Sequence, residues 1–220
     1  MLQVTPATDC ERIDVVGIAQ AVNTATSLAY LVAGVVVVVT MGRRRPVAVV
    51  LGVLLIGEAA GSALYHGDPG TLAQWLHDIA FLGILGLLAG WHVGRLYGRG
   101  DAGAWVGTLG ITALAGLTHP ALTGAVTAVA VVLVTSVVVA EAAAQRREPR
   151  LRPVFDGRLV ALVVLAGVTH ALGRSGSPLC DPDSAVQLHG AWHILSALAV
   201  VVWADRALRA DDLVPGPTPR

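Results

Sequence analysis

The amino-acid sequence predicts an all-α membrane protein, a bundle of seven transmembrane helices with its N-terminus outside and its C-terminus in the cytoplasm. Hydrophobic residues make up 55% of the 220 positions and charged residues only 14%, whereas a soluble chain carries about 25% charged residues. The charged residues are also clustered, which leaves long apolar stretches between them. This composition excludes a nucleic-acid-binding protein, a disordered chain and a disulfide-rich secreted module.

Seven apolar stretches are expected to cross the membrane as helices, because a crossing of the ~30 Å hydrocarbon core takes about 20 residues. They cover residues 15–42, 46–67, 71–94, 102–118, 120–140, 157–173 and 184–204. Residues 102–140 contain no charged residue and would measure about 58 Å as one helix. We therefore expect a turn at Thr118-His119-Pro120, since a proline disfavours helical geometry in the residue before it. Residues 1–210 then form one domain, followed by a disordered tail at 211–220.

The arginines set the expected orientation of the bundle. The chain has 15 basic residues, all of them arginines. Arg12 and Arg174 fall at one set of span ends, and all the others fall at the opposite ends. Because cytoplasmic loops carry an excess of basic residues, the arginine-rich ends are expected inside. Aromatic residues near span ends are expected to form an interfacial belt: Trp75, Trp91, Tyr97, Trp105 and Trp203. The lysine-free, Ala- and Val-rich composition is typical of a GC-rich bacterium, so we expect a multi-pass protein of a bacterial plasma membrane.

Most of the seven histidines are expected near the outer ends of the spans, where three of them have the spacing of a metal site. His189 and His193 are four residues apart, about 6 Å along one face of a helix. His66, from another helix, would be the third ligand, which leaves one position open as in catalytic zinc sites. Asp78 could then hold or deprotonate the metal water, and Ser62 could donate to an oxyanion. Alternatively, Asp78 could only orient a helix or pair with His77, and Ser62 could only pack or bond within its helix. The residues alone leave open a simpler interpretation, in which the histidines form interhelical hydrogen bonds.

Other polar residues within the spans are candidates for contacts around that site, because ionisable groups inside a membrane are costly. Asn23 and His170 are possible second-layer partners of the ligands. Glu58 is either a second-layer acid, a partner of Asn23 or a proton carrier. His77 and His92 are expected to have no particular role.

The two cysteines, Cys10 and Cys180, are both expected on the outer side. An oxidising outer compartment would allow a disulfide between them, and two unrelated thiols are the alternative.

Four segments together match the motifs of a known family. They are Cys10-Glu11, Asn23-Thr24, Gly61-Ser62-Ala63-Leu64-Tyr65-His66 with Asp78 after it, and His189-Gly190-Ala191-Trp192-His193. With these motifs, the chain resembles the alkaline ceramidases and the wider superfamily of seven-helix metal hydrolases that includes the adiponectin-receptor and hemolysin-III-like proteins. The expected outside N-terminus favours the ceramidase branch, because the receptor branch has the inverted topology.

The resemblance implies roles for individual residues. His66, His189 and His193 would bind zinc, Asp78 would handle the proton, and Ser62 would contact the metal water or the oxyanion. Cys10 and Cys180 match the positions of an outer-side disulfide in eukaryotic members. Those members also bind calcium near the first span through oxygen ligands. Here Glu11 is present, but Ile13 and Gln20 stand where further ligands belong, so Ca²⁺ is not expected.

The function implied by the resemblance is a zinc-dependent hydrolase that cleaves the N-acyl amide bond of ceramide or a related N-acyl lipid. The expected partner is therefore a membrane lipid, which would reach the metal near the outer leaflet. A metal-stabilised seven-helix receptor or scaffold without hydrolase activity is the alternative. A proton-coupled transporter using Glu58 and Asp78 would need a continuous polar path, and the inner half of the sequence offers almost no polar residues for one.

Overall fold

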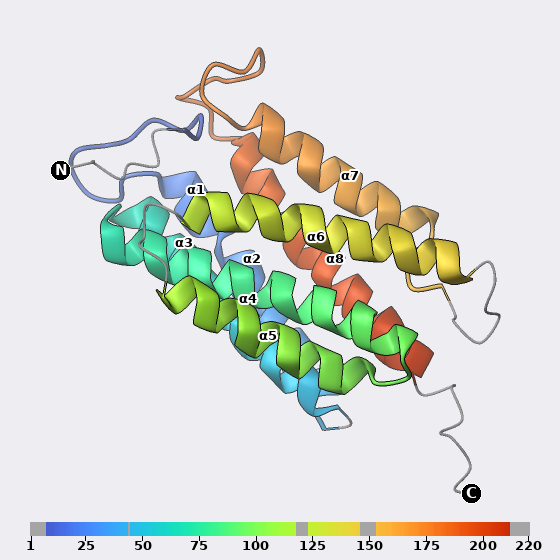
Figure 1. The fold of residues 1–220 in the computed structure, drawn as a ribbon. Helices are drawn as coiled ribbons and strands as arrows, with labels where there is room; N and C mark the ends of the chain where they lie inside the picture. Colours follow the sequence, from blue (N-terminus) through green and yellow to red (C-terminus); the bar gives the residue numbers. More distant parts are fainter. Residues whose placement is uncertain (1–7, 44, 118–122, 146–152, 212–220) are drawn as a thin grey trace, which may run out of the picture.

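The structure, a computed structural model, describes residues 8–43, 45–117, 123–145 and 153–211 and folds them into a bundle of eight helices (Figure 1). The helices are α1 (Ala21–Thr26), α2 (Leu28–Met41), α3 (Pro46–Gly67), α4 (Thr71–Leu96), α5 (Gly100–Leu117), α6 (Thr123–Gln145), α7 (Gly157–Leu172) and α8 (Leu188–Asp211). Within these described residues the β-structure consists of one isolated bridge between Asp9 and Arg174. The expected all-α class is confirmed.

Among the described residues, five helical segments are long and apolar enough to cross a membrane. They are Ala21–Met41, Pro46–Gly67, Thr71–Leu96, Ala125–Gln145 and Leu188–Leu208. α7 is apolar but shorter, and α5 carries Asp101 in its first turn. Each of the seven expected spans corresponds to a helix, with α1 and α2 together forming the first. The multi-pass architecture agrees with the sequence, while the side of the membrane that each end faces stays a prediction.

The first span begins at Ala21 and not at residue 15, as the apolar run had suggested. Residues 11–20 instead fold back over the end of α3, where helical carbonyls lack partners within their own helix. Ala19 N–H donates to the Gly67 carbonyl at 3.0 Å, and Gln20 N–H donates to the His66 carbonyl at 2.9 Å. Gly17 permits this path with a φ of +88°. The apolar run therefore includes a loop that packs onto α3.

Both boundaries of the last expected span also differ from the structure. α8 begins at Leu188 and not at Ser184, because residues 181–187 form turns held by bonds such as Ser184 N–H to the Asp181 carbonyl. α8 then continues to Asp211, so the arginines 206 and 209 belong to a helix. The expected turn at 118–120 and the tail at 212–220 lie outside the described residues, although α5 and α6 are separate helices as predicted.

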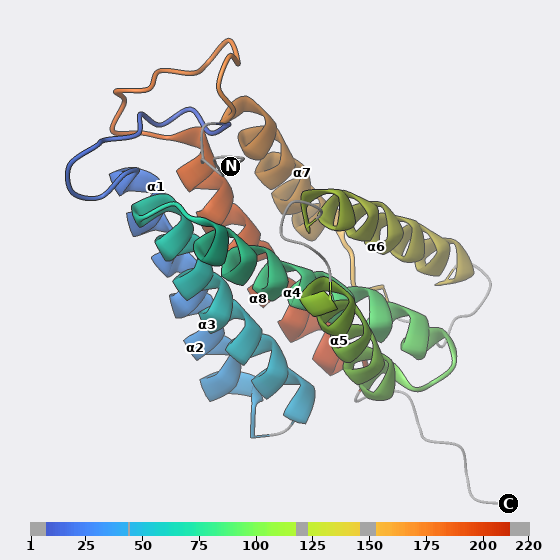
Figure 2. The same cartoon turned by 60° about the vertical axis from the view of Figure 1, so that its left-hand side comes forward.

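α4 runs through the middle of the bundle and packs against α3, α5 and α6 (Figures 1 and 2). α2 packs on α3 and α8, and α7 packs on α8. The closest approach is between α4 and α5, where a Cβ added to Gly90 would lie 2.1 Å from the Gly103 carbonyl oxygen. Small residues allow such backbone contact between membrane helices, so the glycines of this pair have a packing role.

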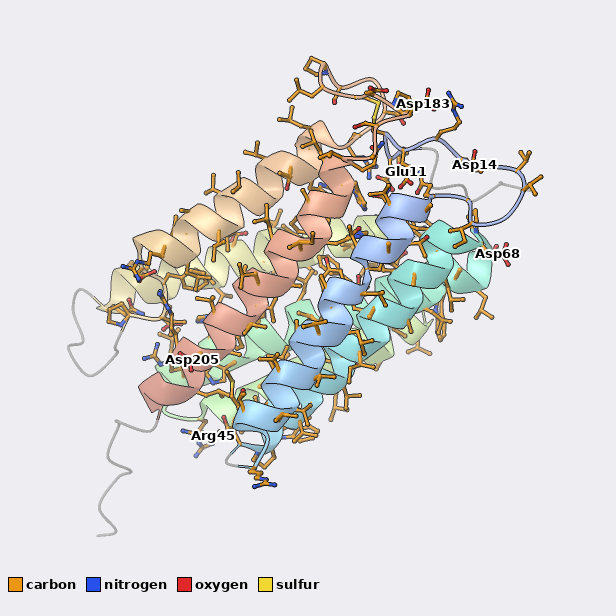
Figure 3. All side chains as sticks on the ribbon, turned by 180° about the vertical axis from the view of Figure 1, so that it is seen from behind. Glu11, Asp14, Arg45, Asp68, Asp183 and Asp205 are labelled. Carbon is orange, nitrogen blue, oxygen red and sulfur yellow. A yellow bond between two sulfur atoms is a disulfide. The ribbon has the colours of Figure 1, made fainter. Side chains whose placement is uncertain are left out.

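The two ends of the bundle differ in charge. We call the end with residues 8–20, 67–71 and 173–188 the histidine end, and the opposite end the arginine end. Figure 3 shows Glu11, Asp68 and Asp183 at the histidine end, and Arg45 and Asp205 at the arginine end. Among the described residues, the connections at the arginine end carry Arg43, Arg45 and Arg99.

The expected aromatic belt and the expected position of Arg95 are only partly correct. Trp91 and Trp203 are buried and meet edge to face, with ring centroids 5.4 Å apart. Tyr97 and Trp105 are exposed, as a belt requires. Arg95 was expected in a loop, but it is buried within α4. Its guanidinium lies over the Trp91 ring, 5.2 Å from the centroid, and its charge is paired inside the bundle.

Candidate metal centre

Three buried histidines meet at the histidine end of the bundle. His66 lies in the last turn of α3, and His189 and His193 lie on successive turns at the start of α8. Each offers a ring nitrogen, and these ligand atoms all lie within 4.8 Å of one another. The ring centroids are 5.1 Å apart for His66 and His189, 5.2 Å for His66 and His193, and 4.7 Å for His189 and His193. The expected meeting of these three side chains is confirmed.

The hydrogen bonding of the cluster fits a metal ion. His66 Nε2 and His193 Nε2 are buried and have no hydrogen-bond partner, a costly state for polar atoms inside a protein. A cation bound between the rings would satisfy both atoms. Three imidazoles suit several transition metals, so the cluster can hold a metal ion without specifying which one.

Gln20 fixes the orientation and tautomer of His66. Gln20 Nε2 donates to the Glu11 carbonyl at 2.8 Å, which turns the amide oxygen toward His66. Because that Oε1 can only accept, the 2.7 Å bond to His66 Nδ1 places the proton on Nδ1. The lone pair of His66 is then on Nε2, the atom that faces the cluster unpaired. Gln20 therefore prepares His66 as a metal ligand.

Thr26 does the same for His193. The Thr26 hydroxyl donates its single proton to the Val22 carbonyl at 2.8 Å, so its oxygen accepts from His193 Nδ1 at 3.1 Å. This contact depends on close approach of α1 and α8. A Cβ added to Gly190 would lie 2.9 Å from Thr26 Oγ1, so a larger residue at that position would push the hydroxyl away.

Asp9 lies behind the third histidine. Its Oδ1 is 3.3 Å from His189 Nδ1, an ion-pair contact without hydrogen-bond geometry, and accepts from Arg174 at 2.9 Å. Burial raises the pKa of Asp9 from 3.8 to about 6, although the Arg174 guanidinium acts in the opposite direction. A carboxylate behind a ligating histidine is a common arrangement in metal sites.

Asp9, Gln20 and Thr26 were not identified from the sequence. The signal for Thr26 is its position three residues after Asn23 on the same helix face. Gln20 and Asp9 reach the cluster only because loop 11–20 folds back and because Asp9 pairs with Arg174. No local pattern indicates either contact.

Two attachments of the N-terminal segment involve residues that the sequence analysis had singled out. Cys10 and Cys180 lie at disulfide distance, with Cα atoms 5.4 Å apart, as the sequence allowed (Figure 3). Both carboxylate oxygens of Glu11 accept backbone N–H groups, from Val22 at 2.6 Å and Asn23 at 2.8 Å. Glu11, which the sequence offered as a lone calcium ligand, thus caps the start of α1.

The remaining predicted residues surround this cluster on several helices. Ser62 is buried one turn below His66, and it donates to Ser27 Oγ at 2.8 Å because Ser27 uses its own proton on the Asn23 carbonyl. The Asn23 side chain is fully buried, and neither of its amide atoms has a hydrogen-bond partner. The His170 ring of α7 lies beside the His189 ring of α8, with ring centroids 5.7 Å apart.

Asp78 and Glu58 both contact His77, which was expected to have no particular role. Asp78 Oδ1 accepts from His77 Nδ1 at 2.9 Å, and Glu58 Oε1 lies 3.3 Å from His77 Nε2. A Glu58–Asn23 pair, one of the three interpretations of Glu58, is wrong. The described contacts thus place Asp78 with His77 and Glu58, on the α3–α4 interface.

His92 also has partners that the sequence did not indicate. It is buried near the arginine end in a group with Arg95, Glu141 and Trp203, which we call the arginine-end cluster. His92 Nδ1 contacts Glu141 Oε2, and Trp203 Nε1 donates to His92 Nε2 at 2.9 Å. Arg95 also bonds Glu141. The half of the bundle next to the arginine end is therefore less apolar than expected.

Comparisons of the chain with models of protein families, with curated proteins and with solved structures find no match. A function is therefore inferred from the geometry of the histidine cluster and from the sequence motifs.

Proposed function

We propose that this protein is an integral-membrane zinc hydrolase that cleaves the N-acyl amide bond of ceramide or a related N-acyl lipid. The observation that carries the proposal is the buried group of His66, His189 and His193, with two ring nitrogens that lack any other partner. The motif resemblance supports the amide as the bond that is cleaved. The arginine distribution supports a site near the outer leaflet of a bacterial plasma membrane.

Three neutral imidazoles with an open fourth position are typical of catalytic zinc. When bound there, zinc polarises a carbonyl and lowers the pKa of water to about 7. The chain supplies the rest. Gln20 and Thr26 hold two imidazoles with Nε2 free, and Asp9 lies behind the third. These contacts spare the site the cost of ordering its ligands.

In this proposal, two further residues transfer the proton and stabilise the oxyanion. Asp78 accepts a proton during attack and returns it to the leaving amine. Ser62 supplies a hydroxyl one turn below His66, and it must exchange its bond to Ser27 for one to the substrate oxygen. The lipid tails lie against the apolar helices, so that only the amide region reaches the polar end.

The proposal is tested by lipid turnover with a matched pair of variants. Detergent-purified wild type, Asp78→Asn and Asp68→Asn are supplied with zinc and assayed for fatty-acid release from ceramide and other N-acyl lipids. Asp68 is exposed at the end of α3 and serves as the control (Figure 3). We expect Asp78→Asn to lose at least roughly 100-fold in kcat while it keeps its zinc, and Asp68→Asn to match wild type.

Zinc-loaded wild type that hydrolyses no lipid of the panel, and that unfolds when zinc is removed, would instead support the receptor or scaffold. Full activity in Asp78→Asn would remove Asp78 from the reaction.

A further inference from the structure

Glu58 is a buried acid in the middle of a membrane-spanning helix. It is 1% exposed, and its Oε2 has no hydrogen-bond partner. An ionised carboxylate in that position carries a large desolvation cost unless a cation compensates it. Glu58 thus requires either a compensating charge or a proton of its own.

Close packing of α3 on α4 brings Glu58 to His77. Gly61 lies one turn after Glu58, and a Cβ added there would be 2.6 Å from the His77 backbone nitrogen. The helices therefore approach closely enough for Glu58 Oε1 to reach His77 Nε2 at 3.3 Å. The Tyr65 ring also stacks on the His77 imidazole, with ring centroids 5.3 Å apart.

The imidazole of His77 thus lies between two carboxyl groups, Glu58 at Nε2 and Asp78 at Nδ1. The exposed fraction of the side chain rises from 2% for Glu58 to 13% for Asp78 and 24% for His77. The contacts therefore connect Glu58, which is sealed from solvent, to two side chains that are more exposed to solvent.

A second buried acid, Glu141, shows what an ionised carboxylate looks like in this bundle. Glu141 is paired with the Arg95 guanidinium and also accepts from Gln145 at 3.0 Å. In the part of the chain that the structure describes, the ion pairs of Glu58 include no arginine, and its contact is with His77. The other titratable groups around Glu58 and His77 are Tyr30, Tyr65, Asp9 and the three histidines of the cluster. The tyrosines and Asp9 supply no positive charge, and histidines that bind a metal are neutral.

We propose that Glu58, His77 and Asp78 form a proton relay in which Glu58 holds the proton at rest. In the resting state Glu58–OH donates to His77 Nε2, and His77 Nδ1–H donates to the Asp78 carboxylate. Transfer of the Nδ1 proton to Asp78 and of the Glu58 proton to Nε2 leaves Asp78 protonated and Glu58 ionised. The net charge of the three groups is −1 before and after, and one proton has moved from Glu58 to Asp78.

The relay deepens the role of Asp78, and that part rests on the proposed hydrolase function. Asp78 exchanges the proton with the substrate. Glu58 and His77 do not contact the substrate, and they deliver the proton to Asp78 or take it back. The shared proton itself is independent of any activity, so the two claims are separable by experiment.

Infrared spectroscopy of the detergent-purified full chain at neutral pH tests the shared proton. The carbonyl stretch of a protonated carboxyl group is resolved from carboxylate bands, and we expect one such band from a buried group. Glu58→Gln should remove it, while the matched variant Glu141→Gln should leave it in place. In D₂O the band should shift quickly in wild type, and roughly tenfold or more slowly in His77→Phe and His77→Gln, because the exchange route runs through the imidazole.

A missing band in wild type, a band that survives Glu58→Gln, or unchanged exchange in both His77 variants would overturn the relay.

In the lipid assay, Glu58→Gln should lower kcat roughly tenfold, less than loss of the acid–base group itself, and remove one limb of its pH profile with the zinc content unchanged. An unchanged kcat and pH profile in Glu58→Gln would overturn the catalytic role. If no variant or wild type turns over lipid while the infrared results hold, the hydrolase proposal fails and the relay stands.

Discussion

The two ends of the bundle each contain buried histidine, but they differ in how the ring nitrogens are used. At the arginine end, His92 has a partner on both sides, Glu141 at Nδ1 and Trp203 at Nε2. At the histidine end, His66 and His193 each have one partnered nitrogen and one buried Nε2 without a partner. A satisfied imidazole needs no ligand, whereas converging unpaired nitrogens indicate one.

The contacts at the two ends also differ in what they hold in place. Those at the arginine end link helices, and those at the histidine end orient imidazole rings. The arginine-end cluster links α4 to α6 through the contacts of Glu141 with Arg95 and His92, and links α4 to α8 through the Trp203–His92 hydrogen bond. α6 packs mainly against α4 and is otherwise largely exposed, so Glu141 is one of its main polar attachments. The histidine end instead uses its second layer of contacts to orient rings that face one another. Four substitutions, each with a matched control, test this contrast between the two ends.

The largest expected effect is on metal binding. His193→Ala should abolish metal binding, because two imidazoles from different helices do not close the site. Glu141→Gln, at the other end, should keep a full metal content. Elemental analysis of both purified proteins measures the difference, and metal retained by His193→Ala would show that the ions bind elsewhere.

The next effect is on stability and belongs to the arginine end. Glu141→Ala removes the carboxylate that pairs with buried Arg95 and His92, which should lower the free energy of unfolding by about 3–5 kcal/mol. Asp14→Ala, at an exposed loop position (Figure 3), should change it by less than about 0.5 kcal/mol. Denaturation in detergent compares the two variants. Equal stability would mean that the arginine-end cluster does not hold α6 in place.

A smaller effect should follow from the contacts behind the ligands. Gln20→Ala removes the acceptor that keeps the proton of His66 on Nδ1, and it should weaken metal affinity about 10- to 100-fold. Gln145→Ala, a glutamine beside Glu141 at the opposite end, is the control and should not change the affinity. Competition with a zinc chelator gives both constants, and identical affinities would remove Gln20 from the site.

The smallest effect concerns the single hydrogen bond that satisfies His92 Nε2. Trp203→Phe deletes this donor and should cost about 1 kcal/mol of stability, while exposed Trp105→Phe should cost less. The variant should take up no additional metal, since one unpaired imidazole does not make a site. Thermal unfolding and metal content are measured together, and an extra bound ion would contradict the distinction drawn between the two ends.

The features predictable from the sequence were those with a local pattern. The spans follow from apolar length, and His189 and His193 follow from their spacing on one helix. His66 was placed with them by its depth in the second span. Asn23 and Ser62 are buried, while their roles at the site stay predictions, and the Ser62 bond to Ser27 was not foreseen.

The contacts that the sequence did not indicate depend on tertiary structure. Gln20 reaches His66 only because an apolar run became a loop and returned over α3. Glu141 follows directly after a long apolar stretch and resembles an ordinary helix end, yet it meets His92 and Arg95 across an interface. His77 contacts Glu58 because Gly61 allows α3 and α4 to approach closely. In each case the partners are distant in the sequence, as the separation of Glu141 and Arg95 by 46 residues illustrates.

The most direct test of the proposed metal centre is the metal content of the wild-type protein after purification in detergent without chelators. We expect about one zinc per chain, lost on chelation and regained when zinc is added back. A folded protein that contains no metal and takes up none on addition would contradict the proposal, because the unpaired nitrogens of His66 and His193 would then have no ligand to bind.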